Sequence, residues 1–285
     1  MSSISLDQKQ FTRLSTFIET ELGIKMPPAK RVMLESRLQK RLRALGLTDF
    51  DAYIRHVFEH EGDEIIHMID VVTTNKTDFF REPDHFVFLA DHVLPHALER
   101  GWGDGRNFFK AWSAASSTGE EAYTLAVVMG EFRRINPRFD FRILGTDISS
   151  AVLATARKAV YPAHRIDPVR PELRKRYFMR SRNGEDPLVR VKPALRERVQ
   201  FHRMNLMAAR FPVQDRFHVI FCRNVIIYFD RQRQEELLRK LYDYLVPGGL
   251  LFLGHSETLA GMDLPVTSVA PTVYRRPERE GGLRA

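Results

Sequence analysis

Apolar residues recur every three or four positions along residues 1–73, the spacing that places them on one face of an amphipathic helix. Ser5 is the predicted N-cap of the first helix, and Gly23 and Gly46 are predicted to end the first two helices. Together these segments predict a small helical bundle. The predicted helices lie within Ser5–Gly23, Ala29–Leu45, Asp49–His60 and Asp63–Val72.

From about Asn107 the pattern changes, and short apolar runs alternate with segments of helical spacing. Strands that alternate with helices in this way are typical of a parallel α/β sheet. A last strand is predicted within Val266–Arg276. The other predicted strands are Asn107–Trp112, Phe141–Gly145, His218–Cys222 and Leu250–Leu253, and the predicted helices are Glu120–Arg133, Ser150–Ala159 and Arg231–Leu245.

Asn183 and Gly184 lie between two runs of alternating polarity, which is a hairpin signal. We therefore expect a small antiparallel β-subdomain at about residues 168–204, inserted in the α/β domain. The predicted division of the chain is a helical domain at 1–73, a linker with an active-site motif at 74–100, the α/β domain at 101–279 and a tail at 280–285.

The composition narrows the class of protein. Hydrophobic residues make up 44% of the 285 residues, but no apolar run approaches the roughly 18 residues that span a bilayer. The N-terminus also lacks the apolar segment of a secretory signal, so we expect a cytoplasmic protein with no membrane insertion. The formal net charge of +8 favours an acidic partner, such as nucleic acid, an anionic membrane or an acidic protein.

Metal chemistry is not expected. The chain has one cysteine, Cys222, which has no partner for a disulfide or for a Cys-rich zinc site. The ten histidines are scattered and form no H-E-x-x-H motif. His255, in the stretch Gly254–Glu257, is the one histidine that we keep as a candidate for catalysis.

The loop after the first predicted strand has the sequence AWSAASSTGEEAYTLA. Ligands of parallel α/β sheets bind beyond the carboxyl ends of the strands, and a dinucleotide loop there would carry G-x-G-x-x-G. This loop has only Gly119, and Glu120 and Glu121 would repel a pyrophosphate. A cationic ligand therefore fits it better.

Asp147 ends the second predicted strand, where an acid can accept hydrogen bonds from ribose hydroxyls. A ligand with a ribose, a positive charge and no phosphate is S-adenosylmethionine. Each acid alone is equally well explained otherwise, because Glu120 and Glu121 suit the start of a helix and Asp147 can cap the next helix. Their joint occurrence at successive strand ends favours the cofactor.

Several longer motifs in this chain resemble those of the chemotaxis receptor methyltransferases, the CheR family of protein-glutamate O-methyltransferases. The resemblance implies a helical N-terminal domain, a linker, and a Rossmann-like α/β methyltransferase domain that carries a small antiparallel β-subdomain, as the patterns above predict. The motifs are TTNKTDFFRE (73–82), WSAASSTGEEAYT (112–124), TDIS (146–149), FCRNVIIYFD (221–230) and GHSE (254–257).

The resemblance also implies roles for single residues. Glu121 would bind the methionine end of the cofactor and Asp147 its ribose, while Asn205 and Leu206 would flank the adenine. Arg81 and Tyr228 would be catalytic, the first at the acceptor and the second at the methyl group. The implied cofactor-binding residues are Asn75, Thr77, Arg81, Glu121, Asp147, Asn205, Leu206, Arg223 and Asn224. Ala122 departs from the family, in which many members have proline, but proline at this helix position is optional.

The activity implied by the resemblance is methylation of glutamate side chains on chemoreceptor cytoplasmic helices, with S-adenosylhomocysteine as the second product. A receptor tail peptide at the β-subdomain is a further candidate partner. The basic residues of one helix would dock the acidic receptor, and they are Lys30, Arg31, Arg37, Lys40, Arg41 and Arg43.

Two alternatives are weighed against this activity. The positive charge favours a nucleic-acid methyltransferase, but the loop sequence NVIIY lacks the Asn or Asp, Pro-Pro and aromatic series common in enzymes that methylate exocyclic nitrogens. The basic helix also lacks interleaved aromatic residues for stacking on bases. An adaptor that binds the cofactor without transferring the methyl group has no support from the intact motifs.

Overall fold

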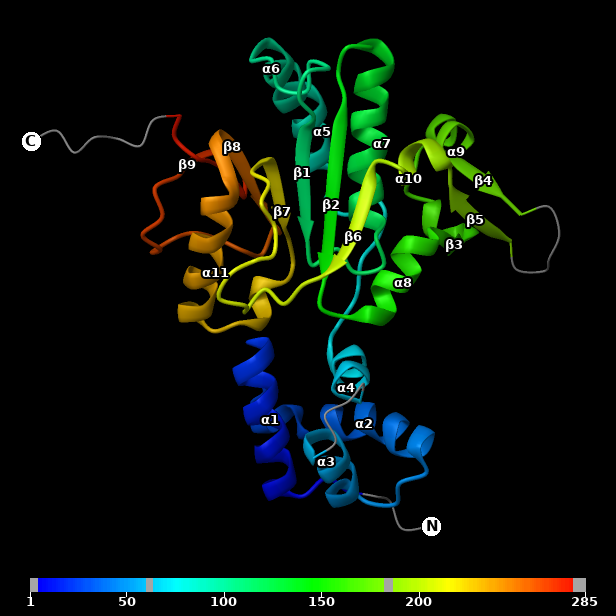
Figure 1. Ribbon diagram of the computed structural model, residues 1–285, viewed down its shortest axis with the longest axis vertical. Helices are drawn as coiled ribbons and strands as arrows, with labels where there is room; N and C mark the ends of the chain where they lie inside the picture. Colours follow the sequence, from blue (N-terminus) through cyan, green and yellow to red (C-terminus); the bar gives the residue numbers. More distant parts are fainter. Residues whose placement is uncertain (1–4, 60–63, 182–186, 279–285) are drawn as a thin grey trace, which may run out of the picture.

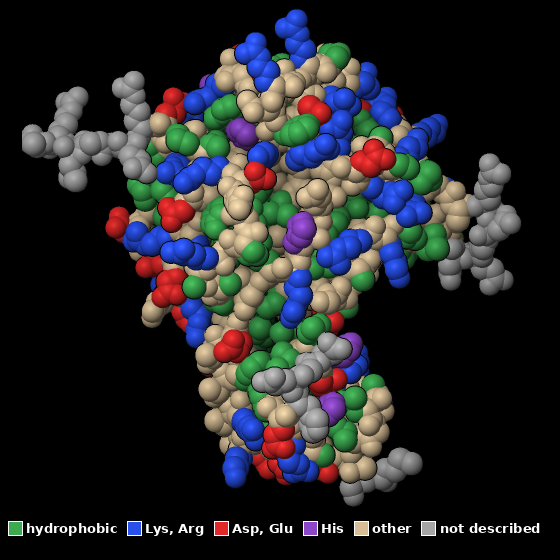
Figure 2. All heavy atoms as spheres, in the orientation of Figure 1, with side chains coloured by type: hydrophobic (Ala, Val, Ile, Leu, Met, Phe, Trp, Pro, Cys, Tyr) green, Lys and Arg blue, Asp and Glu red, His purple; other side chains and the backbone are tan. Residues whose placement is uncertain are grey.

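The structure, a computed structural model, describes residues 5–59, 64–181 and 187–278. A helical bundle lies at one end of the molecule, next to a larger part built around a sheet (Figure 1). The bundle is visibly narrower than the part it adjoins (Figure 2). Its elements are α1 (Gln8–Leu22), the 3-10 turn η1 (Pro28–Lys30), α2 (Arg31–Leu45), α3 (Phe50–Glu59) and α4 (Glu64–Val72).

Local sequence determines where the first two helices of the bundle begin and end. Gly23 and Gly46 end α1 and α2 in the left-handed conformation, with φ of 71° and 67°, which confirms both predicted stops. The predicted N-cap Ser5 is wrong, because Asp7 caps α1. The side chain of Asp7 accepts from the backbone N–H of Gln10, and the side chain of Gln10 accepts from the N–H of Asp7, which completes a capping box.

The larger part contains a sheet with the strand order β6-β2-β1-β7-β8-β10-β9. Its first five strands are parallel, and β10 runs antiparallel to both β8 and β9. The predicted last strand is therefore a hairpin of two strands. The strands are β1 (Phe109–Ala114), β2 (Phe141–Asp147), β6 (Val199–Arg203), β7 (Phe217–Cys222), β8 (Leu245–Leu253), β9 (Thr267–Ala270) and β10 (Val273–Arg275).

Helices cover both faces of this sheet. Successive residues of a strand point to opposite faces, so each strand contributes side chains to both cores. Phe109 and Ala111 of β1 belong to the core on the side of α7, whereas Trp112 and Ala114 belong to the core on the side of α11. The helices of the first side are α5 (Asp84–Phe88), the π-helical segment η2 (Leu89–Val93), α6 (Leu94–Glu99), α7 (Glu120–Ile135) and α8 (Ser150–Lys158), and the second side has α11 (Arg231–Tyr244).

A second, antiparallel sheet has the order β3-β5-β4. Strands β4 and β5 form the predicted hairpin, but its turn at Asn183 and Gly184 lies outside the described residues. Strand β3 precedes residue 168, and β6 lies within 168–204 although it pairs with β2 in the large sheet. The elements here are β3 (Val160–Pro162), η3 (Ala163–Ile166), α9 (Pro171–Tyr177), β4 (Phe178–Arg180), β5 (Leu188–Val191) and α10 (Pro193–Arg196).

The predicted fold class is thus confirmed: a helical domain, an α/β domain with a mostly parallel sheet, and a small antiparallel sheet. The numerical domain boundaries stay a prediction. Among the described residues, none of the helices combines the length and apolar character needed to cross a membrane.

Candidate active site

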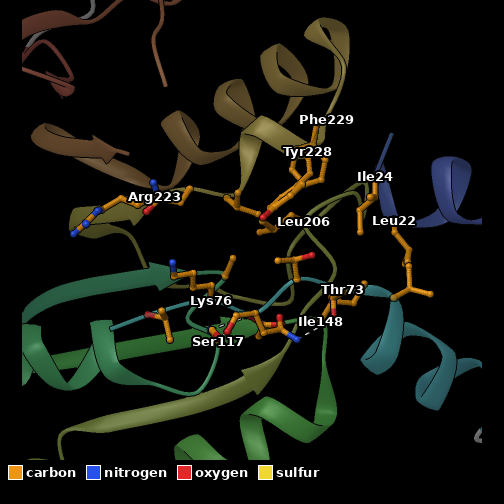
Figure 3. A pocket seen from close by; sticks show the side chains of 18 of the residues that line it. Leu22, Ile24, Thr73, Lys76, Ser117, Ile148, Leu206, Arg223, Tyr228 and Phe229 are labelled. Atoms are coloured by element: carbon orange, nitrogen blue, oxygen red, sulfur yellow. Dashed lines mark hydrogen bonds between the residues drawn. The ribbon is translucent and has the colours of Figure 1, made fainter. Parts of the chain in front are cut away.

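A cavity of about 300 Å³ lies between the carboxyl ends of the parallel strands and the helical bundle (Figure 3). Residues from the linker, from four strand ends and from the first two helices line it, so segments far apart in the sequence meet here. His255, kept above as a candidate for catalysis, is not among the residues that line this cavity. The residues to which the family resemblance assigns a role in cofactor binding or catalysis all line it: Asn75, Thr77, Arg81, Glu121, Asp147, Asn205, Leu206, Arg223, Asn224 and Tyr228.

The loop after β1 has an unusual backbone. Ala115, Ser117 and Gly119 all have positive φ, at 60°, 50° and 95°, a conformation that non-glycine residues rarely adopt. At Gly119 a Cβ atom would also lie 2.9 Å from the Cβ of Ala156 in α8. The small residues of this stretch therefore let the loop turn sharply, with Ala115 and Ser117 lining the cavity.

Asp147 is held in place by backbone donors. Its two carboxylate oxygens accept hydrogen bonds from the N–H groups of Ser117, at 2.9 Å, and Ser149, at 3.0 Å. Burial raises the pKa of this carboxyl, and the hydrogen bonds from Ser149 and Ser117 oppose that rise. Each oxygen keeps a lone pair, so a fixed carboxylate at the end of β2 can still accept ribose hydroxyls.

The half-buried Glu121 and the buried Arg223 form a pair with unused hydrogen-bonding capacity. Glu121 accepts from the hydroxyl of Ser113 at 2.6 Å, and its other oxygen lies 3.7 Å from Nε of Arg223. Burial raises the pKa of Glu121, and Arg223 and Ser113 oppose the rise. The Arg223 side chain is 1% exposed, yet its Nε and Nη1 atoms have no hydrogen-bond partner among the described residues.

Buried donors without partners are rare and call for an explanation. An α-amino acid group supplies one, because its carboxylate would accept from Arg223 and its ammonium would donate to Glu121. The methionine end of S-adenosylmethionine carries both groups. The residues present therefore fit the cofactor at this point of the cavity.

Glu120 does not face the cavity, contrary to its expected part in a ligand-repelling loop. Its carboxylate is 1% exposed and pairs with Arg165 of η3 at 2.6 Å. Arg165 also bonds Asp78 at 2.8 Å and the carbonyl of Thr77, so it joins the linker to the start of α7. The acidic character of the loop toward a ligand rests on Glu121 alone.

Glu257 is a site residue that the sequence patterns missed. Its buried carboxylate accepts backbone hydrogen bonds from Asn224, Val225, Ile226 and Gly254 at 2.6 to 3.0 Å. These bonds fix the turn after β7, in which Asn224 has a φ of 56°. The motif GHSE contains this residue, but no local spacing indicates that its carboxylate holds a turn 31 to 33 residues earlier in the chain.

Glu82 at the end of the linker motif was missed as well. Its carboxylate accepts from Nη2 of Arg223 and from Nδ2 of Asn224, both at 3.0 Å. Arg223 also donates to the carbonyl of Arg81. The linker is thus bound to the turn after β7, which places the side chains of both segments around one cavity.

The two predicted catalytic side chains lie at this cavity. Arg81 is half-buried and donates one hydrogen bond, to the carbonyl of Lys76 at 2.9 Å. Tyr228, in the 3-10 turn η4 (Ile226–Tyr228), points its ring into the cavity (Figure 3). Their positions allow contact with a bound ligand, and their catalytic roles stay predictions.

The helical bundle meets the α/β domain at a seam beside the cavity. The side chain of Asn205 donates to the carbonyl of Glu21 at 2.7 Å, and the N–H of Lys25 donates to the carbonyl of Tyr228 at 2.8 Å. The φ of 71° favours glycine at residue 23, and a Cβ atom there would lie 2.5 Å from the sulfur of Met207, which would have to move. The bundle therefore closes one side of the cavity.

Two of the six predicted docking residues are engaged within the protein. Arg37 donates to oxygens of residues 72–74 at the start of the linker. Arg41 donates twice to Glu64, at 2.9 and 2.6 Å. Arg37 thus joins the bundle to the linker and Arg41 joins α2 to α4, so neither guanidinium is free to meet a partner.

The remaining members of that set differ in exposure. Lys30 lines the cavity and donates to the carbonyl of Lys25 at 2.8 Å. Arg31, Lys40 and Arg43 are exposed on α2. Docking stays a prediction, and only these three exposed residues can carry it from the outer surface.

The geometry defines the class of ligand. Asp147 can hold a ribose, Glu121 can hold a cationic group, and the carboxylate of Glu121 disfavours a phosphate. An α/β domain with such a site at its strand ends is that of an S-adenosylmethionine-dependent methyltransferase.

Family comparisons name the particular group. Residues 9–73 match the CheR methyltransferase all-alpha domain, and residues 75–274 match the CheR methyltransferase SAM binding domain. The chain therefore belongs to the CheR methyltransferase family. This result confirms the predicted family, enzyme class and cofactor.

Curated relatives match over nearly the whole chain. The chemotaxis protein methyltransferase of Escherichia coli (strain K12) is 39% identical over 273 residues, which cover 95% of this chain and 92% of the relative. That of Borreliella burgdorferi is 35% identical over 276 residues and 96% of both chains. The similarity thus includes the helical bundle as well as the α/β domain.

Proposed function

We propose that this protein transfers the methyl group of S-adenosylmethionine to glutamate carboxylates on chemoreceptor cytoplasmic helices. The observation that carries the proposal is the cavity at the strand ends, where the Glu121 and Arg223 pair adjoins Arg81 and Tyr228. Relatives that match the chain along its length are chemotaxis protein methyltransferases, which favours a receptor as the substrate.

The chemistry needs alignment more than proton transfer. When bound, S-adenosylmethionine supplies an electrophilic methyl group. A glutamate with a pKa near 4.3 is ionised at neutral pH and needs no general base. Arg81 would hold one carboxylate oxygen of the acceptor, and Tyr228 would wall the space where the methyl group passes. Enclosure by the bundle would exclude water and strengthen these electrostatic contacts.

The nucleic-acid alternative loses its main support. Basic side chains on the visible face are interspersed with acidic and apolar ones (Figure 2), so this face offers no continuous basic groove. Arg37 and Arg41 of the basic helix have partners inside the protein. The relatives reported above are named for chemotaxis.

The chemistry of the product tests the proposed reaction. Receptor-containing membranes labelled with methyl-tritiated cofactor are expected to release volatile methanol in mild alkali, because hydroxide cleaves a carboxyl methyl ester. Methylated nitrogen has no acyl bond and would keep its label. Label that stays on protein, or that appears on added nucleic acid, would contradict glutamate as the acceptor.

The exposed basic residues of α2 are proposed to dock the acidic receptor. Lys40 and Arg43 are three residues apart and so lie on one side of the helix. Reversing both to glutamate is expected to lower receptor methylation about three- to tenfold at low ionic strength, because opposite charges accelerate encounter. Initial methylation rates over a range of salt concentrations measure this effect, which should shrink as salt rises.

A matched control reverses Arg106 and Arg138 to glutamate. Both are exposed in loops that precede β1 and β2, at the end of the sheet away from the cavity. This variant has the same net charge as the first. Equal losses in the two variants would assign the effect to net charge and remove α2 from docking.

We further propose that a receptor tail peptide adds to the small sheet. Strand β4 is an edge of the order β3-β5-β4, and an edge strand can bind an extended peptide through its backbone. Calorimetry with receptor C-terminal peptides tests this contact. Absence of binding to all tail peptides of the cognate receptors would contradict it.

A further inference from the structure

Three potential metal ligands lie close together beside Arg223, in the turn after β7. Glu82 comes from the linker, His85 from α5 and His255 from the segment after β8, and one ligand atom of each lies within 4.8 Å of the others. Oε2 of Glu82 is 3.7 Å from Nδ1 of His85. His255 is exposed, so its ring can reorient toward the other two.

The protonation of His85 follows from its neighbours. The hydroxyl of Thr272 lies 2.8 Å from the carbonyl of Pro271 and 2.9 Å from Nε2 of His85. We assign its hydrogen to the carbonyl, which makes the hydroxyl oxygen the acceptor for Nε2. Nε2 therefore carries the hydrogen and Nδ1 a lone pair.

Nδ1 of His85 is buried and has no hydrogen-bond partner among the described residues. It faces Oε2 of Glu82, which lies 3.7 Å away. Two electron-pair donors thus face each other without a hydrogen atom between them. A cation between them would give Nδ1 of His85 a partner and would share the carboxylate of Glu82 with Arg223.

The donor set selects the kind of cation. Two imidazoles and one carboxylate suit Zn²⁺, whereas Mg²⁺ and Ca²⁺ prefer oxygen ligands. Ligand atoms about 2.1 Å from a tetrahedral zinc ion are about 3.4 Å apart, so Glu82 and His85 are already close to the required spacing. Rotation of His255 would bring in the third ligand, and water can take the fourth position.

We propose that Glu82, His85 and His255 bind Zn²⁺, and that this binding weakens the affinity for S-adenosylmethionine. The oxygen of Glu82 nearest His85 is also the acceptor for Arg223. A metal bond to that oxygen competes with the guanidinium, which is the group adjoining Glu121 in the cavity. The site would thus act as an inhibitory metal switch.

Calorimetric titration of the full chain with ZnCl₂ tests the site itself. We expect one tight site in the wild type and at least about tenfold weaker binding in His255→Ala, since loss even of outer-shell groups costs that much. His202→Ala, which removes another exposed histidine, should bind as the wild type does. Co²⁺ should give the visible absorption of a tetrahedral site in the wild type only, and MgCl₂ should not bind. Equal zinc affinity in wild type and His255→Ala, or no binding, would overturn the site.

The coupling is measured by titrating S-adenosylhomocysteine with and without Zn²⁺. For each protein we compare the affinity for S-adenosylhomocysteine in zinc with its affinity in chelator. We expect zinc to lower the affinity of the wild type at least about threefold and to leave that of His255→Ala nearly unchanged. Zinc that binds without changing the cofactor affinity would overturn the inhibitory role. Failure of the product to bind in chelator would instead count against the proposed function, because the zinc titration does not depend on it.

Discussion

Replacing Arg81 by alanine is expected to lower receptor methylation at saturating cofactor about 100-fold, with a change of about threefold or less in cofactor affinity. Removal of one hydrogen-bond donor directed at the charge of a reacting group lowers the rate on this scale. The side chain is half-buried and, within the described part of the chain, donates only to the Lys76 carbonyl, so its loss opens no core cavity. The contact from Arg223 is to the Arg81 carbonyl and survives the substitution.

Turnover measured against receptor, together with calorimetry of S-adenosylhomocysteine, separates the two predicted roles of Arg81. Arg81→Lys is the matched control, because lysine keeps the charge but lacks the planar fork that holds a carboxylate. We expect it to recover part of the rate. Equal losses of turnover and cofactor affinity would make Arg81 a cofactor-binding residue and not a catalytic one.

Replacing Asp147 by alanine is expected to weaken the binding of S-adenosylmethionine and S-adenosylhomocysteine at least about 100-fold. Hydrogen bonds to a charged group contribute about 1.5–3 kcal/mol each, and two ribose hydroxyls would lose theirs. The N–H groups of Ser117 and Ser149 would also lose their acceptor, which loosens the loop after β1. Calorimetry measures the affinity.

Asp147→Asn is the matched control, because asparagine keeps the shape of the side chain and one acceptor oxygen but removes the charge. We expect an affinity between those of the wild type and the alanine variant. Thermal unfolding of all three proteins separates loss of binding from loss of folding. An unchanged affinity in a folded Asp147→Ala protein would contradict the ribose role of this residue.

Much of the α/β fold could be predicted because its strands are buried on both faces and therefore form continuous apolar runs. The runs near Phe109, Phe141 and Phe217 each mark a parallel strand. The short strands were harder. Strand β3 has three residues, too few for a period, and β6 is paired with β2 only through contacts across the sheet that no local pattern reveals.

Some residues of the candidate site could likewise be predicted from the sequence, and others could not. Residues at the end of a strand, such as Asp147, or directly after one, such as Arg223, could be placed from the strand pattern and the family motifs. Partners that are distant in the sequence could not. Glu82 contacts Arg223 across 141 residues, and Glu120 is neutralised by Arg165, 45 residues later. Local spacing carries no information about such pairs.

The seam between bundle and α/β domain has an evolutionary consequence. Two of its hydrogen bonds use main-chain atoms of the bundle, the carbonyl of Glu21 and the N–H of Lys25, which exist whatever the side chains are. Gly23 has a φ of 71° there, a conformation that favours glycine, and a side chain at this position would have to displace Met207. The outward-facing residues of the bundle can therefore change while the cavity keeps its wall. A chimera with another member's bundle should stay active if it retains this glycine.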